Sequence, residues 1–83
     1  MIKVLFFARV RDQVGCAGLD MELPAGVSDV AGFTATVKAM GAAFEQALSE
    51  PNVLIAVNQE MANSQMTVED GDEIAYFPPV TGG

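Results

Sequence analysis

The C-terminal end of this sequence holds the group that is best suited to chemistry. Its last seven residues are Phe77, Pro78, Pro79, Val80, Thr81, Gly82 and Gly83, and a free carboxylate is expected on Gly83. An α-carboxyl group has a pKa of about 3.3 to 3.7, so it is ionised at neutral pH and is a poor acyl electrophile. We therefore expect chemistry at Gly83 to require an enzyme that activates the carboxylate.

The backbone before this carboxylate suits entry into a narrow slot in another protein. Pro78 and Pro79 fix their φ angles and favour an extended path, whereas Gly82 and Gly83 carry no side chains and admit close approach. Fully extended, the stretch from Val80 to Gly83 would reach about 13 to 14 Å. The alternative interpretation is that a terminal Gly-Gly pair is an ordinary frayed chain end.

Length and charge limit the classes of function. The 83 residues suffice for one domain, and an apolar content of 51 % is ample for its core. Four Lys and Arg residues against eleven Asp and Glu residues give a net charge of -7. Such a charge repels phosphate groups, which argues against binding to nucleic acid or to anionic membranes. The acidity serves either solubility or steering towards a basic partner.

Residues typical of metal or redox sites are scarce. The chain has one cysteine, Cys16, and no histidine, so neither an internal disulfide nor a metal site is predicted. The acidic residues at positions 69, 70, 72 and 73 are interpreted as a solvated turn. The apolar N-terminal run is too short to span a membrane, and Arg9 and Arg11 follow it instead of preceding it as in a signal peptide. We therefore expect a cytoplasmic protein.

Hydrophobic patterning predicts an α+β fold. Strands are expected over residues 2–8, 19–23, 53–57 and 73–77, with a short strand after a turn that begins at residue 58. The main helix is expected to begin at the N-cap Ser28 and to end at Gly41, with an apolar stripe of Val30, Phe33, Thr34 and Val37. Shorter helical segments are expected over residues 9–14 and 42–49, the first ended by Gly15.

Three segments carry a family resemblance: residues 2–11 (IKVLFFARVR), 54–59 (LIAVNQ) and 70–83 (DGDEIAYFPPVTGG). In this order they resemble the small subunits of molybdopterin synthase, which belong to the ubiquitin-like β-grasp sulfur carriers. The resemblance implies that residues 1–77 form a β-grasp domain, a mixed sheet of about five strands wrapped on one main helix. It also implies that the first and last strands are parallel neighbours at the centre, and that residues 78–83 are an extended tail.

The same resemblance implies a chemistry for the tail. A ubiquitin-activating-type enzyme would adenylate Gly83, and a sulfur donor protein would convert this transient AMP adduct to a thiocarboxylate. Gly82 and Gly83 would then enter the large synthase subunit and give sulfur to a cyclic pterin precursor to form the molybdopterin dithiolene. The chain would be the sulfur-donor subunit of a heteromeric enzyme, with no permanent cofactor and with the catalytic side chains on the large subunit.

The alternation of side chains along the predicted strands also predicts a docking surface. Because side chains alternate, Phe7 and Phe77 should project from the face opposite the core residues Val4, Phe6, Ile74 and Tyr76. By the resemblance, Met61 completes this patch, and residues 78–81 bind the partner as the stem of the tail. The alternative is that loops or a short helix cover Phe7 and Phe77 as a second small core. Arg9 and Arg11 are weaker candidates, as contacts for the activating enzyme.

Three other functions stay open at this stage. The chain could carry sulfur for another pathway, such as thiazole synthesis. It could be a ubiquitin-like modifier that is joined through Gly83 to lysines of target proteins. It could also be a passive binding domain with an inert tail.

Overall fold

The computed structural model describes residues 1–79 of the chain. These residues form five strands and three helices. The elements are β1 (Ile2–Phe6), α1 (Ala8–Val14), β2 (Gly18–Met21), α2 (Val30–Lys38), α3 (Ala42–Leu48), β3 (Leu54–Val57), β4 (Glu60–Ala62) and β5 (Glu73–Phe77). Among these residues no helix is long and apolar enough to cross a membrane.

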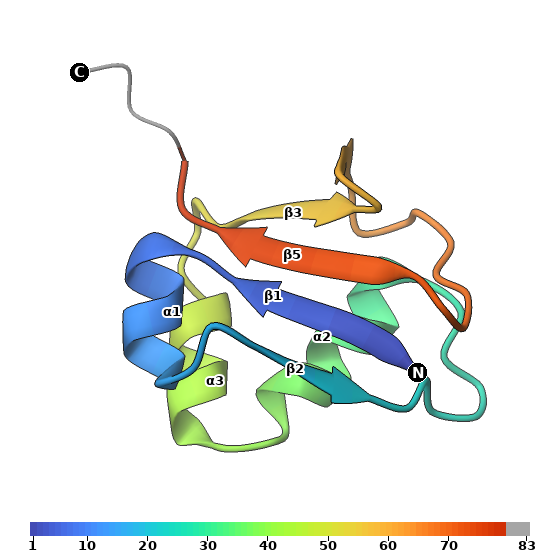
Figure 1. Ribbon diagram of the computed structural model, residues 1–83, viewed down its shortest axis with the longest axis horizontal. Helices are drawn as coiled ribbons and strands as arrows, with labels where there is room; N and C mark the ends of the chain where they lie inside the picture. Colours follow the sequence, from blue (N-terminus) through green and yellow to red (C-terminus); the bar gives the residue numbers. More distant parts are fainter. Residues whose placement is uncertain (80–83) are drawn as a thin grey trace.

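The strands form one mixed sheet in the order β2-β1-β5-β3-β4. The central pair, β1 and β5, is parallel, with Val4 opposite Ile74 and Phe6 opposite Tyr76. All other pairs are antiparallel. The predicted α+β class and the parallel pairing of the first and last strands are therefore confirmed (Figure 1).

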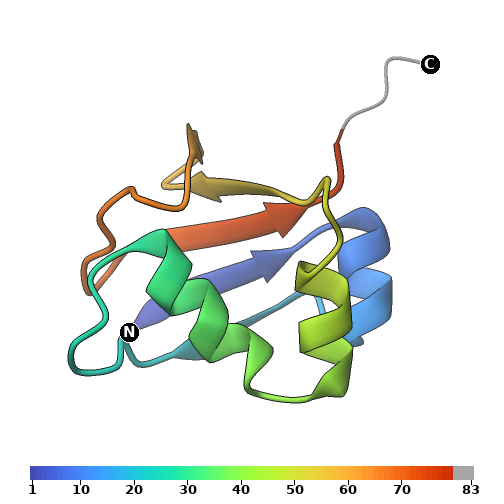
Figure 2. The same ribbon diagram turned by 180° about the vertical axis from the view of Figure 1, so that it is seen from behind.

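The two faces of the sheet differ. Helices α2 and α3 lie behind one face, and no helix crosses the other in either view of the described chain (Figures 1 and 2). The core is buried under the helices because alternate strand residues point towards them. Its fully buried large side chains are Ile2, Val4, Phe6, Val10, Val30, Phe33, Val37, Ile74 and Tyr76.

The junction between β1 and α1 corrects the predicted strand end. The strand was expected to continue to residue 8, but Ala8 adopts a left-handed φ of 52° and begins α1. This φ breaks the extended path directly after Phe7. The helix ends at Gly15, as predicted, where φ is 85° and the backbone N–H donates to the Arg11 carbonyl at 2.9 Å.

The limits of the main helix differ from the prediction at both ends. The N-cap is Asp29 and not Ser28, because the Asp29 carboxylate accepts a hydrogen bond from the Gly32 N–H at 2.8 Å. The helix ends at Lys38, so the prediction that Gly41 terminates it was wrong. Gly41 is instead the N-cap of α3.

The remaining strands lie close to their predicted positions. Strand β2 covers Gly18–Met21 instead of residues 19–23, and β3 begins one residue later than expected. The turn between β3 and β4 consists of Asn58 and Gln59, both with left-handed φ angles, of 51° and 70°. Two such residues are typical of the tight turn that joins two hairpin strands.

Candidate functional site

The predicted tail begins after Phe77, where the two central strands end together. Strand β5 ends at Phe77, and the Phe7 backbone N–H donates to the Tyr76 carbonyl at 3.1 Å, just beyond the end of β1. Parallel pairing therefore brings Phe7 and Phe77 to neighbouring positions at one end of the sheet. Pro78 and Pro79 follow, both half-buried. The predicted site residues Val80, Thr81, Gly82 and Gly83 lie outside the described residues.

The face without helices, which we call the open face, carries an apolar row in register across four strands. Leu5 of β1 is opposite Ala75 of β5, Ala75 is opposite Ala56 of β3, and Ala56 is opposite Met61 of β4. Nearer the tail, Phe77 is opposite Leu54. A row of apolar residues thus crosses the open face as far as the edge strand β4, and its two alanines, Ala75 and Ala56, are themselves buried.

The structure locates the three predicted anchor residues on this face. Phe7 and Phe77 are neighbours, and Met61 lies three strands from Phe7 on the same face, with Ala75 and Ala56 between. Phe7 is 47 % exposed and Met61 60 % exposed, so within residues 1–79 neither is covered as part of a second small core. Their role in partner binding stays a prediction.

The opposite side of the same strand ends packs in the core. The ring of Tyr76 stacks on Phe6 with a centroid distance of 6.0 Å and an interplanar angle of 19°, and Phe6 also contacts Phe44. The Tyr76 hydroxyl shares a hydrogen bond of 2.8 Å with the Thr34 hydroxyl of α2. Burial raises the pKa of Tyr76 to about 12, against the opposing effect of this hydrogen bond. The phenol is therefore neutral and positions β5, with no acid-base role near neutral pH.

The pair of Thr34 and Tyr76 did not emerge from the sequence. Thr34 was expected only as a member of the helix stripe, and Tyr76 only as a core residue. The pair could have been suspected because each residue carries a hydroxyl on a face that is expected to be buried. A buried hydroxyl requires a hydrogen-bond partner.

Two carboxylates of the acidic turn before β5 bind neighbouring groups of the fold. The Asp72 carboxylate accepts hydrogen bonds from Asn58 Nδ2 at 3.0 Å and from the Glu69 backbone N–H at 2.8 Å. Asp70 pairs with the N-terminal ammonium, whose hydrogen bond and charge hold the pKa of this carboxyl below its usual value. Among residues 1–79 no group of acidic, His or Cys side chains is arranged to hold a metal ion.

The remaining candidate residues lie on α1 and in the loop that follows it. Arg9 and Arg11 are exposed on α1, and Arg11 Nε lies 3.8 Å from Asp12 Oδ1. Cys16 is half-buried and packs against the edge of the core.

The parallel central strands, the single covered face and the apolar open face at the tail root define a ubiquitin-like β-grasp domain. A chain from Pyrococcus furiosus, solved as a candidate molybdopterin converting factor, subunit 1, has this fold with a TM-score of 0.72. It is 28 % identical to this chain, and the match covers 95 % of this chain and 97 % of that one. A chain from the complex of subunits 1 and 2 of molybdopterin-converting factor from Helicobacter pylori 26695 shares the fold, with a TM-score of 0.68 and 22 % identity. The match covers 99 % of this chain and 97 % of that one.

Sequence comparison identifies the family. The model of the ThiS family matches residues 4–83, and the chain belongs to this family. The molybdopterin synthase sulfur carrier subunit of Escherichia coli (strain K12) is 42 % identical over 83 residues, a match that covers 100 % of both chains. The predicted resemblance is therefore confirmed, and it extends through the described sheet and the residues beyond it.

Proposed function

We propose that this chain is the sulfur carrier subunit of a molybdopterin synthase and that Gly83 is the residue that carries sulfur. The observation that carries this proposal is the match to a sulfur carrier subunit at 42 % identity over the full length of both chains. A match of this extent includes the C-terminal Phe-Pro-Pro-Val-Thr-Gly-Gly segment. The open face supports the proposal, since a tail that enters a partner needs a docking surface at its root.

Loading of the carrier takes two steps. In the first, an oxygen of the Gly83 carboxylate attacks the α-phosphorus of ATP in an activating enzyme, and pyrophosphate leaves. In the second, sulfide-level sulfur from a donor protein attacks the carbonyl carbon, and AMP leaves with the oxygen that joined it to the carbonyl. The product is a thiocarboxylate, and no cofactor stays on the chain. Activation is needed because the free carboxylate is an anion and a poor acyl electrophile.

Transfer takes place in the large subunit of the synthase. The tail inserts there, and the thiocarboxylate sulfur bonds to a carbon of the cyclic pterin precursor and displaces an oxygen substituent from that carbon. Water then hydrolyses the thioester between Gly83 and this sulfur, which leaves the sulfur on the pterin and returns Gly83 as a carboxylate. Two loaded carriers supply the two sulfurs of one dithiolene. The acid-base side chains are assigned to the large subunit. This assignment is supported by the lack of histidine in this chain and by the burial of its one tyrosine, whose pKa is about 12.

Intact-mass spectrometry tests the proposal. The chain is incubated with ATP, the cognate activating enzyme and a sulfur source, and the expected mass gain equals the replacement of one oxygen by sulfur. A variant that lacks Gly83 is the matched control and should gain nothing. Sulfur gained by both chains, or by neither, would exclude Gly83 as the carrier residue. Isopeptide adducts to lysines of other proteins, with no sulfur gained, would favour a modifier instead.

A further inference from the structure

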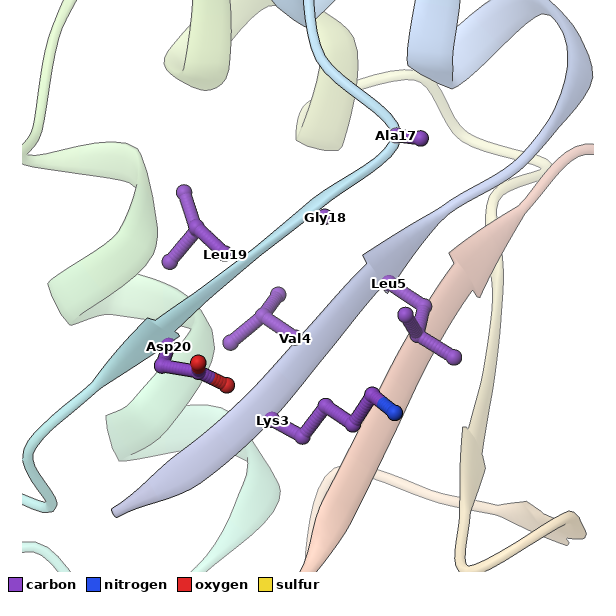
Figure 3. A pocket seen from close by; sticks show the side chains of 7 residues that line it. All are labelled: Lys3, Val4, Leu5, Ala17, Gly18, Leu19 and Asp20. Carbon is purple, nitrogen blue, oxygen red and sulfur yellow. The ribbon is translucent and has the colours of Figure 1, made fainter.

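A hollow of about 260 Å³ lies on the open face, between β1 and β2. The residues around it belong to the two paired strands, except Ala17, which precedes β2, and Figure 3 shows Lys3, Leu5, Gly18 and Asp20 among them. Pockets that enclose a small ligand have volumes of about 300 to 1,000 Å³. This hollow is smaller and open, and it suits one side chain of a docked protein better than a small molecule.

Gly18 keeps the hollow open. It is opposite Leu5 in the antiparallel pair, so a side chain at residue 18 would project from the open face beside Leu5. A Cβ at residue 18 would lie 2.7 Å from the Val4 carbonyl oxygen and 3.1 Å from Leu5 Cδ2, and both distances are shorter than the usual contacts of a Cβ atom. The Leu5 side chain therefore forms an apolar wall beside bare backbone.

An unpaired carboxylate lies at the mouth of the hollow. Asp20 is exposed and opposite Lys3 in the register. Figure 3 shows the Lys3 side chain extending towards β5, away from Asp20, whose carboxylate points over the space between β2 and β1. Within residues 1–79 Asp20 forms no ion pair. An apolar wall with one free anion at its edge has the chemistry to bind a long cationic side chain.

We propose that the hollow receives an arginine side chain of the large subunit, a specificity contact that rests on the proposed function. The aliphatic stem packs on Leu5 and the backbone of Gly18, and the guanidinium group pairs with Asp20. Arginine fits better than lysine because its planar group binds a carboxylate through two parallel hydrogen bonds and because arginine is enriched among interface anchors.

Two observations favour the large subunit as the source of this arginine. The hollow is continuous with the docking surface, since Leu5 is in register with Ala75 in the row that ends at Met61. The net charge of -7 also favours a basic surface on the partner. A docked protein that covers Phe7 and Phe77 would reach the hollow by extending along β1.

The test compares two variants with the same change of charge. Asp20→Asn removes the carboxylate at the hollow, and Glu45→Gln removes an exposed carboxylate from α3, beyond the opposite face of the sheet. Affinity for the large subunit is measured for each full chain at several salt concentrations. We expect Asp20→Asn to bind about two- to fivefold more weakly, with a shallower salt dependence, as for a partly exposed ion pair. Glu45→Gln should bind like the parent.

Two further variants separate the apolar and the charged parts of the contact. Asp20→Lys places like charges together and should weaken binding by about tenfold or more. Leu5→Ala removes the wall and should weaken binding by about fivefold, with the salt dependence unchanged. Urea unfolding of each variant verifies the fold, and both positions are on the open face, outside the core.

Each contrary outcome is informative. If Asp20→Asn and Glu45→Gln weaken binding to the large subunit equally, the effect is general electrostatic steering and the proposed site is wrong. The proposed site is also wrong if the Asp20→Asn chain binds like the parent. If Asp20→Asn slows sulfur loading but leaves binding to the large subunit unchanged, the hollow contacts the activating enzyme and the proposed contact with the large subunit is wrong. If the parent chain fails to bind the large subunit, the proposed function fails together with this inference. If the parent binds, Phe77→Ala weakens binding and Asp20→Asn does not, this inference fails alone.

Discussion

Phe6 and Phe7 are the same residue type at adjacent positions, yet they lie on opposite faces of the sheet. Phe6 is 1 % exposed and packs between Phe44 and Tyr76, whereas Phe7 is 47 % exposed. Tyr76 and Phe77 show a weaker form of the contrast on the neighbouring strand, because Tyr76 is fully buried and Phe77 is half-buried. The comparison shows that alternation of side chains gives one strand end two different surfaces, because one residue packs in the core while the next points to the open face.

The largest difference between the two faces should appear in stability. We expect Phe6→Ala to lower the free energy of unfolding by about 3 to 5 kcal/mol, the usual loss for a buried phenylalanine. Phe7→Ala should lower it by less than about 1 kcal/mol because the side chain is half exposed. Urea denaturation of both variants measures the contrast. Equal losses would mean that Phe7 belongs to a second small core, and the distinction between the faces would be lost.

The buried tyrosine gives the core face a pH dependence of its own. The pKa of Tyr76 is about 12 in the folded chain and about 10 when unfolded, so the unfolded chain loses the phenol proton first as the pH rises. This contribution to stability is fully present below pH 10 and is lost between about pH 10 and pH 12, a loss of about 2 to 3 kcal/mol.

Urea unfolding at several pH values measures this loss, and Tyr76→Phe is the control that should remove it. Because Tyr76 is the one tyrosine in the chain, tyrosinate absorbance reports its titration directly. An absorbance change centred near pH 10 in the folded chain would show that the hydroxyl is accessible to solvent, contrary to its burial against Thr34.

The open face should dominate binding. We expect Phe77→Ala and Phe7→Ala each to weaken binding to the large subunit by more than about 1 kcal/mol if both are anchors. Met40→Ala is a matched control, since Met40 is 46 % exposed but lies in the connection between α2 and α3, the helices behind the opposite face. Titration calorimetry measures the affinities. If Met40→Ala weakens binding as much as Phe7→Ala does, loss of any exposed apolar side chain has the same effect, and the docking surface is not specific.

Local sequence patterns predicted the faces of the sheet but not its cross-strand partners. Alternation along residues 2–8 and 73–77 was sufficient to assign Phe7 and Phe77 to the face opposite Phe6 and Tyr76, because that alternation is a property of each strand alone. The hydrogen bond between Thr34 and Tyr76 joins residues 42 positions apart, and no local pattern contains it. The hollow beside Gly18 likewise depends on register, which brings a glycine opposite Leu5.

The errors at element ends have a different cause. Ser28 and Asp29 are both good N-cap residues, so sequence alone could not separate them, and the structure selects the one whose carboxylate reaches the Gly32 N–H. Gly41 was assigned to the end of α2, although glycine is also common at an N-cap, the position that it takes before α3. The end of β1 before Ala8 could not be predicted from the residue type, since an alanine with positive φ is uncommon.

The smallest expected effect concerns the backbone that turns the chain away from Phe7. Ala8 has a φ of 52°, which costs a non-glycine residue about 1 to 2 kcal/mol, whereas glycine would give up about 0.5 to 1 kcal/mol of chain entropy instead. Ala8→Gly should therefore raise the free energy of unfolding by about 0.5 to 1 kcal/mol.

The reciprocal change at the other end of α1 is the matched control. Gly15 has a φ of 85° with open space where a Cβ would lie, so Gly15→Ala should lower stability by about 1 kcal/mol through the backbone alone. Urea unfolding of both variants measures whether the free energy of unfolding rises or falls in each. The affinity of each variant for the large subunit shows whether the turn at Ala8 affects docking at the open face. If Ala8→Gly raises stability but weakens binding, the strained turn positions Phe7 for docking. If it lowers stability, strain at Ala8 is absent, and β1 ends at Phe6 for another reason.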